Sequence, residues 1–215
     1  MKYPILFIAI TASLIWGVIS STSPNRFILI WPALNTSILA IAYILNKPTF
    51  IAGKQKNGKI NYFLLIINAP WLVLSWLTWI LIYFISKENK VDKVNGTNWF
   101  ISSYPGLRYK ENDYQLIVDL TSEFPRPINH GSNYICFPNL DGVPLSNLPE
   151  SLSINPESKV LVHCAQGHGR SATWSSIALT KLGIFPNTKS AYSAIKASRP
   201  GAVASTKQEQ QLNAI

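Results

Sequence analysis

The 215-residue sequence contains little cysteine, little acidic charge and only three histidines. Its two cysteines, Cys136 and Cys164, are too few for the disulfide scaffold of a small secreted protein. None of the histidines stands at a metal-ligand spacing, so we expect no metal and no other cofactor. The chemistry of the chain is therefore expected to rest on its own side chains.

The shortage of acidic residues leaves a net charge of +9, and this charge is unevenly distributed. Residues 1–94 carry nine basic and two acidic side chains, and the remaining residues carry ten basic and eight acidic ones. The basic excess flanks apolar stretches, where it favours anionic lipid headgroups over nucleic acid. We therefore expect a membrane partner and no nucleic-acid partner.

Three stretches lack any charged residue: Tyr3–Asn25, Phe27–Asn46 and Ile60–Ser86. A helix needs about 20 apolar residues to cross a bilayer. We predict transmembrane helices at 3–21, 27–46 and 60–86, with a signal peptide as the alternative for the first. Five basic residues would then lie on one side of the membrane and four on the other, so the positive-inside rule does not decide the orientation.

The rest of the chain has the pattern of a small α/β domain. A polar linker is predicted at 87–97, between a membrane region at 1–86 and a domain at 98–215. Helices are predicted at about 171–182, 187–198 and 205–215, with room for a short helix at 148–155. Alternating strands and helices predict a central, mainly parallel sheet flanked by helices. The short apolar runs that predict its strands are Leu116–Leu120, Tyr134–Phe137 and Val160–Cys164.

The third of these runs leads into the most informative motif. It reads His163-Cys164-Ala165-Gln166-Gly167-His168-Gly169-Arg170-Ser171. A strand joined to a helix by a tight loop directs backbone N–H groups at one point, which is also the positive end of the helix dipole. The planar guanidinium of Arg170 suits two phosphate oxygens at once. The same groups would stabilise a thiolate at Cys164, which is then a nucleophile toward bound phosphorus.

This motif resembles the signature of the cysteine-dependent protein tyrosine phosphatases, and residues from about Trp99 to Leu212 resemble their dual-specificity branch. The resemblance implies that Cys164 is the nucleophile and that Arg170 holds the phosphate. It implies that His163 supports the loop and that Ser171 donates a hydrogen bond to the departing sulfur. It also implies a substrate-binding loop of Ala165, Gln166, Gly167, His168 and Gly169.

The family also uses a general acid and, in some members, a glutamine that places water. By resemblance, Asp141 in the loop Phe137–Pro144 is the acid, with Asp119 as runner-up in what looks like a structural position. An ordinary turn aspartate is the competing interpretation of Asp141. Gln208, nine positions after Arg199, matches the water-placing glutamine. A solvated helix position is the alternative, and the neighbouring Gln210 and Gln211 leave the choice open.

These residues predict a membrane-anchored phosphatase that hydrolyses phosphomonoesters through a phosphocysteine. The substrate is either a phosphotyrosine, phosphoserine or phosphothreonine protein or a phospholipid phosphate. A phosphate-binding module without turnover is the alternative, and sulfur transfer or arsenate reduction is a third class. The predicted spans make the chain a multi-pass membrane protein. Because a thiolate survives better in a reducing compartment, we expect its catalytic domain on the cytoplasmic side. A protective disulfide between Cys136 and Cys164 is a further hypothesis.

Overall fold

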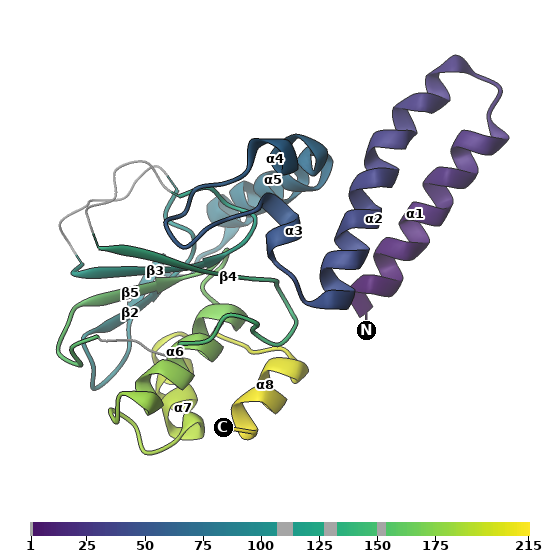
Figure 1. The fold of residues 1–215 in the computed structure, drawn as a ribbon. Coiled ribbons are helices and arrows are strands. Elements are labelled where there is room, and N and C mark those ends of the chain that lie inside the picture. Colours follow the sequence, from purple (N-terminus) through teal and green to yellow (C-terminus); the bar gives the residue numbers. More distant parts are fainter. Residues whose placement is uncertain (1, 107–113, 127–132, 150–153) are drawn as a thin grey trace.

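The computed structural model describes residues 2–106, 114–126, 133–149 and 154–215. Its centre is a five-stranded sheet with the order β1-β2-β5-β3-β4, in which β1 is antiparallel to β2 and the other neighbours are parallel (Figure 1). This arrangement confirms the predicted α/β class and the mainly parallel sheet. Positions 150–153 of the short helix predicted at 148–155 lie outside the described residues. The strands are β1 Val91–Lys93, β2 Trp99–Ser102, β3 Leu116–Thr121, β4 Tyr134–Asn139 and β5 Val160–His163.

Three C-terminal helices cover one side of the sheet: α6 Gly169–Lys181, α7 Thr188–Ser198 and α8 Thr206–Asn213. Trp99 of β2 stacks on Trp174 of α6, and both side chains are fully buried in the core between the sheet and these helices. Polar caps start the later helices, because a side-chain oxygen there accepts a bond from an otherwise unpaired backbone N–H. Asn187 caps α7, and Ser205 caps α8 in a capping box.

The N-terminal part begins with a helical hairpin. It consists of α1 Lys2–Ser20, the 3-10 helix η1 Pro24–Leu29 and α2 Ile30–Leu45. By length and composition, Lys2–Ser20 and Pro24–Leu45 are long and apolar enough to cross a membrane. The loop of the hairpin lies far from the sheet, and the N-terminal end of α1 lies close to it (Figure 1).

The third predicted span is wrong. The stretch 60–86 is divided at Asn68 into α4 Tyr62–Ile67 and α5 Ala69–Ile85, and α5 has only 17 residues. Pro70 stands in the first turn of α5, where its missing N–H costs no helical hydrogen bond. The buried Asn68 amide accepts a bond from Asn35 and donates to the carbonyls of Phe50 and Ile51, which fixes the break. The structure therefore has two candidate membrane helices among its described residues.

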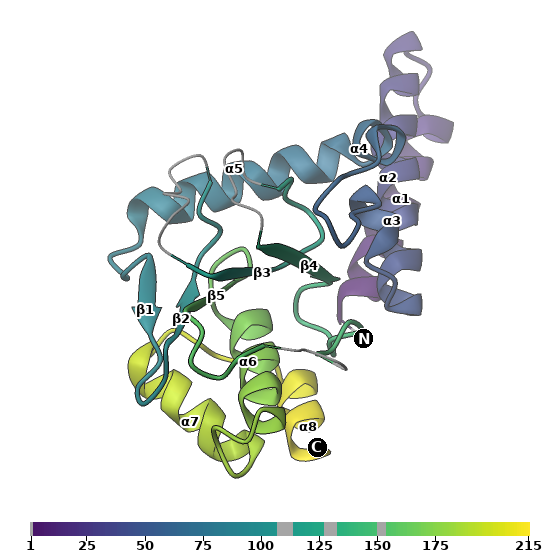
Figure 2. The same ribbon diagram turned by 60° about the vertical axis from the view of Figure 1, so that its left-hand side comes forward.

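Helix α5 crosses the molecule on the side of the sheet opposite α6–α8 (Figure 2). Its Trp76 Nε1 donates to the carbonyl of Glu123 at 2.8 Å. Its Trp79 makes edge contacts with Tyr104 and Phe124, at centroid distances of 5.3 and 5.7 Å. These partners follow β2 and β3, so α5 packs on the loops at the carboxyl ends of the strands.

Two further segments outside the predicted domain join the sheet. Strand β1 lies within the stretch predicted as a linker. The segment that follows α3 Thr49–Ala52 runs beside β4, where the N–H of Cys136 donates to the carbonyl of Lys56 at 2.8 Å. From the same segment, Lys54 enters the interior and is fully buried. The N-terminal part is thus built into the α/β domain at both edges of the sheet.

Candidate active site

The predicted phosphate-binding loop joins β5 to α6 at the carboxyl edge of the sheet, where ligands bind in open parallel sheets. Cys164 follows β5 directly and its residue is 3% exposed. Gly167 adopts a φ of +71°, and a Cβ there would lie 2.5 Å from the backbone carbonyl of Ser102. Only glycine fits at this position, because the loop both turns left-handed and touches the end of β2.

Arg199 holds the outer side of this loop. Its Nε donates to the carbonyl of Gly167 at 3.0 Å, and its Nη2 donates to the carbonyl of Gln166 at 3.1 Å. In a trans peptide the N–H and C=O point in opposite directions. The amides of Gly167 and His168 are therefore directed away from Arg199, as an anion cradle requires. Asp92 of β1 in turn accepts from Arg199 Nη1 at 2.5 Å.

Arg170, at the far end of the loop, is 1% exposed and held by two acidic side chains. Its Nη2 and Nη1 bond the two carboxylate oxygens of Glu123 at 2.7 and 2.9 Å. Its Nε lies 3.2 Å from a carboxylate oxygen of Asp141. Burial lowers the pKa of Arg170, but Glu123 and Asp141 outweigh burial and raise it. The guanidinium is therefore a fixed positive charge beside Cys164.

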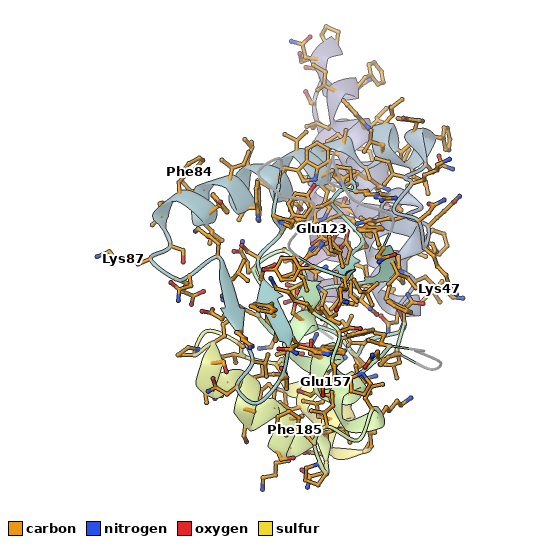
Figure 3. The ribbon with its side chains drawn as sticks, turned by 90° about the vertical axis from the view of Figure 1, so that its left-hand side faces the viewer. Lys47, Phe84, Lys87, Glu123, Glu157 and Phe185 are labelled. Carbon is orange, nitrogen blue, oxygen red and sulfur yellow. The ribbon has the colours of Figure 1, made fainter. Side chains whose placement is uncertain are left out.

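Glu123 is the main site residue that sequence reasoning missed as a functional group. Burial raises the pKa of its carboxyl, but the charge and hydrogen bonds of Arg170 outweigh burial and lower it. Glu123 lies in the interior, between α5 and the strands (Figure 3). Its sequence neighbourhood carries no signal of this pairing, which depends on how β3 lies beside β5.

The two candidate acids occupy different environments. The side chain of Asp141 follows β4 and is 64% exposed at the mouth of the site. Asp119 is fully buried, 2.6 Å from Lys54 Nζ and bonded by the hydroxyl of Tyr134 at 2.6 Å. Burial raises and Lys54 lowers the pKa of Asp119, with a net lowering. A buried, ion-paired carboxylate cannot reach a leaving group, so the runner-up role of Asp119 is excluded and Asp141 remains the predicted acid.

His163 directly precedes Cys164 in the chain, Ser171 directly follows Arg170, and both residues are fully buried. His163 Nδ1 is 3.8 Å from a carboxylate oxygen of Asp119, and burial lowers the pKa of its imidazole, which is therefore neutral at pH 7. Ser171 Oγ has no hydrogen-bond partner among the described residues. The loop histidine, His168, instead bonds Glu88 through Nε2 at 2.7 Å.

The structure separates the three glutamines of α8. Gln208 is buried against the loop, since a Cβ on Gly169 would lie 2.8 Å from its Oε1. That oxygen accepts the N–H of Ser205, while Nε2 has no partner in the described part of the chain. Gln211 bonds the N–H and carbonyl of Leu145, and Gln210 is exposed. Of the three, Gln208 has a donor left over beside the loop.

A cavity of about 310 Å³ opens in front of the loop. One end is formed by Arg170, Asp141, Ala165 and Gln166. The opposite wall belongs to the N-terminal part, chiefly to α5. The region predicted to be an anchor alone therefore lines the candidate active site.

The disulfide hypothesis does not fit the sheet. Cys136 of β4 is in register with Asp119 of β3, which is in register with His163 of β5. Two strand spacings of about 4.8 Å separate the two cysteine-bearing strands. A disulfide requires Cα atoms within about 7 Å, so Cys136 and Cys164 cannot be bridged in this fold.

No protein-family model and no curated protein matches the chain. Solved structures do resemble it in fold. Tk-PTP in its active form is 22% identical over 58% of this chain and 95% of that chain, with a TM-score of 0.48. Human DUSP28 is 17% identical over 59% of this chain and 92% of that chain, with a TM-score of 0.45. Human tyrosine phosphatase-like serine/threonine/tyrosine-interacting protein is 18% identical over 58% of this chain and 93% of that chain, with a TM-score of 0.44.

These neighbours are dual-specificity and protein tyrosine phosphatase-like folds. Within the described residues, no group of three or more histidine, cysteine or acidic side chains is placed to hold a metal ion.

Proposed function

We propose that the chain hydrolyses phosphomonoesters through a phosphocysteine intermediate on Cys164. The observation that supports this proposal is a strand–loop–helix with a buried cysteine at one end and a buried arginine at the other. Arg199 turns the loop carbonyls outward, and Glu123 holds the guanidinium of Arg170 beside the loop. Such a cradle suits a phosphate dianion and the nucleophile that attacks it.

In the first step, the loop amides and Arg170 bind the phosphate oxygens. The Cys164 sulfur attacks phosphorus, so that an S–P bond forms and the bond from phosphorus to the leaving oxygen breaks. The leaving oxygen takes the bonding electron pair and receives a proton from Asp141. Asp141 must part from Arg170 Nε to do this, and its exposed position at the mouth of the cavity permits that movement.

In the second step, water attacks phosphorus and the S–P bond breaks. Asp141, now a carboxylate, takes the proton of the water, and the electron pair returns to sulfur as inorganic phosphate forms. The free Nε2 donor of Gln208 is suited to orient that water. Ser171 would donate to the leaving sulfur, and the neutral His163 keeps the base of the loop in place.

We also propose that the α1–α2 hairpin spans a membrane. Among the described residues, large apolar side chains that are exposed all lie between Tyr3 and Ile85, except Val91, Val203 and Ile215. Trp16 is 71% exposed and Ile19 is 70% exposed, and both belong to a helix whose one charged residue is Lys2 at its start. An apolar surface of this extent requires a lipid or protein cover.

With two spans in place of three, the positive-inside rule distinguishes the two sides of the membrane. On the far side of a two-span hairpin, the basic residue of the connecting segment is Arg26. On the domain side stand Lys2 and, nearest α2, the exposed Lys47, Lys56 and Lys59. This difference supports a cytoplasmic catalytic domain.

The phosphatase proposal is tested with the purified full chain and an aryl phosphate. Hydrolysis should persist in the presence of a chelator, disappear in Cys164→Ser and remain in Cys136→Ser, which replaces the other buried cysteine. Activity retained in Cys164→Ser would contradict the proposal. Phosphate binding without any turnover by the natural sequence would indicate the binding module instead. Loss of turnover in Asp141→Asn for an alkyl phosphate, whose leaving oxygen needs a proton, would argue against the sulfur-transfer or arsenate class.

The orientation is tested by thiol labelling in intact cells. In a background of Cys136→Ser and Cys164→Ser, which removes both natural thiols, a cysteine introduced at Asn25 in the hairpin loop reports its own side of the membrane. Asn25→Cys should react with a membrane-impermeant maleimide in intact cells. A matched Lys59→Cys variant should react only after the cells are opened, and the reverse pattern would contradict a cytoplasmic domain.

A further inference from the structure

We propose that the phosphomonoester taken by this site is a membrane lipid, with its phosphate at the loop and its apolar chains along α5. This inference rests on the proposed phosphatase function and adds the class of substrate. It starts from the cavity in front of the loop, which has two chemically different ends.

The polar end is the one that performs the chemistry. Among the described residues that line the cavity, the charged ones are Glu123, Asp141 and Arg170. Glu123 is engaged by Arg170, and Asp141 is exposed at the mouth. The charge available to a ligand is therefore gathered at one place, where the phosphate binds.

The other end of the cavity is mainly apolar and comes from the N-terminal part of the chain, with Ser75 and Thr78 of α5 and Tyr43 of α2 as its polar side chains. Helix α5 contributes no charged side chain to it, since its 17 residues contain none. The apolar side chains of this wall are Trp71, Leu74, Trp79 and Ile82 of α5, with Ile51 and Leu140 beside them.

The apolar wall continues onto an apolar surface. Leu74 lines the cavity and is nevertheless 56% exposed, so the cavity opens along α5. The neighbouring outer face of α5 carries Leu77 at 57% and Leu81 at 60% exposure. Phe84 projects away from the sheet on this helix (Figure 3). A ligand with hydrocarbon chains thus meets apolar contacts from the cavity to the helix surface.

Aromatic and basic residues at the end of α5 suit a lipid headgroup layer. Lys90 donates to the carbonyl of Tyr83 at 2.5 Å and lies 4.2 Å from the centre of its ring. Lys87 and Lys93 are exposed nearby. Tyrosine and lysine in this combination are typical of the boundary between hydrocarbon and headgroups, where basic residues also attract anionic lipids.

A phosphopeptide fits the same cavity less well. Along the α5 wall, its backbone N–H and C=O groups would meet mainly apolar side chains, with the hydroxyls of Ser75 and Thr78 as the polar groups of that helix. Backbone groups left unpaired there would cost free energy. Acyl chains have no such groups, and their burial against apolar side chains is favourable. The lining therefore favours a lipid phosphate over a phosphopeptide.

The experiment compares four substrates with the full chain in mixed detergent micelles. They are long-chain phosphatidic acid, short-chain phosphatidic acid, a tyrosine phosphopeptide and an aryl phosphate. We expect kcat/KM for the long-chain lipid to exceed those for the short-chain lipid and the phosphopeptide by at least about tenfold, because the longer chains bury more apolar area. Equal or better cleavage of the phosphopeptide would overturn the proposal.

A pair of matched variants tests the wall itself. Leu74→Asp places a charge in the cavity wall, and Ile215→Asp places the same charge on an exposed apolar residue at the C-terminal end, which does not line the cavity. The α1–α2 hairpin, which neither variant changes, is expected to keep both proteins in the micelle. Leu74→Asp should lower the ratio of lipid to aryl phosphate turnover by about tenfold, and Ile215→Asp should leave that ratio near its natural value.

An unchanged ratio in Leu74→Asp would overturn the lipid proposal while leaving the phosphatase intact. Failure of the natural sequence to hydrolyse aryl phosphate would instead overturn the underlying function. The two failures are therefore distinct.

Discussion

In the proposed mechanism, the guanidinium of Arg170 must meet two requirements that call for different surroundings. A phosphate clamp must be positively charged and correctly oriented before the substrate arrives, yet this side chain is 1% exposed. Glu123 meets both requirements, because its two oxygens fix the fork of the guanidinium and compensate its charge. The carbonyl of Asn139 accepts a further bond from Nη1 at 3.1 Å. Arg170 is thus prepared for the phosphate by the protein alone.

Substitution of Glu123 by glutamine should weaken this preparation. Glu123→Gln keeps the size of the side chain but removes the charge that orients Arg170. We expect kcat/KM for an aryl phosphate to fall about tenfold, in keeping with the cost of losing a charged partner. Steady-state kinetics and inhibition by inorganic phosphate measure the loss. Glu157→Gln on an exposed turn is the matched control, and a Glu123→Gln enzyme with natural kinetics would contradict the orienting role.

Among single residues, the sequence predicts those of the loop motif from Cys164 to Arg170. Cys164, Arg170 and the loop glycines follow one another in the chain, so their geometry is determined by one strand, one turn and one helix. Glu123 and Arg199 were not predictable as loop supports, because their contacts depend on tertiary packing. In the sequence, Arg199 stands out only by its spacing from Gln208, which does not indicate the loop carbonyls that it binds.

Among the elements, the loop after β4 has an unexpected support. Asn46, at the end of α2, donates from Nδ2 to the carbonyl of Pro144 at 2.9 Å. Leu140 and Val143 share a buried cluster with Phe7 of α1 and Leu39 of α2. The loop that carries Asp141 therefore packs on the base of the hairpin. The position of the proposed acid depends on two helices that are remote from it in sequence.

Loosening this support should impair proton donation selectively. Asn46 has a φ of +49°, which glycine adopts without strain, so Asn46→Gly removes the bond to Pro144 and keeps the turn. We expect kcat to fall several-fold for an alkyl phosphate, whose leaving oxygen needs the proton, and to change little for a nitrophenyl phosphate.

Asp141→Asn should show the same dependence on the leaving group, more strongly. Combining Asn46→Gly with Asp141→Asn should add little to the loss in Asp141→Asn alone, because both act through one carboxyl. Equal losses for good and poor leaving groups in Asn46→Gly would contradict this coupling.

The helical elements also show why one prediction failed. The charge-free stretch 60–86 has the composition of a membrane span, and hydropathy does not detect a break made by hydrogen bonds. The helix break at Asn68 becomes apparent only in the folded chain, where its side-chain amide bonds Asn35 and the carbonyls of Phe50 and Ile51. The apolar side chains of this stretch instead belong largely to α5, which lines the cavity in front of the loop.

Across the whole molecule, one buried ion pair joins the N-terminal part to the sheet. Lys54 Nζ contacts the carboxylate of Asp119 at 2.6 Å and the hydroxyl of Thr121 at 2.8 Å, and neither charged side chain is exposed. Asp119 also accepts from Thr121 through its other oxygen. A charge buried in this way requires its partner, since desolvation is otherwise uncompensated.

Loss of Lys54 should therefore destabilise the entire fold. Lys54→Met leaves Asp119 buried without a cation, which costs about 3–5 kcal/mol. The double variant with Asp119→Asn should recover part of that loss. Thermal and chemical unfolding of the full chain in detergent measure both, and a Lys54→Met protein as stable as the natural one would contradict the coupling.

The free energy of unfolding at acidic pH should depend on the ion pair of Lys54 and Asp119. Burial raises the pKa of Asp119, but Lys54 outweighs it, so the folded-state pKa lies below the unfolded value of about 3.9. The unfolded state then binds more protons below that pH, and the contribution of the pair is lost as the pH falls from about 4 toward the folded-state pKa. Asp119→Asn should lack this part of the acid dependence. Lys54→Met should reverse its sign, because burial without the cation raises the pKa of Asp119 above the unfolded value, so that stability falls as the pH rises.

The location of Lys54 has a consequence for where the proposed activity could operate. A domain released by cleavage between the helices and the sheet would lose the counter-ion of Asp119, the edge bond at Cys136 and one wall of the cavity in front of the loop. Under the proposed function, release by a protease would therefore inactivate the protein and would not set free a diffusible phosphatase. The proposed reaction would then take place only where the full chain is inserted.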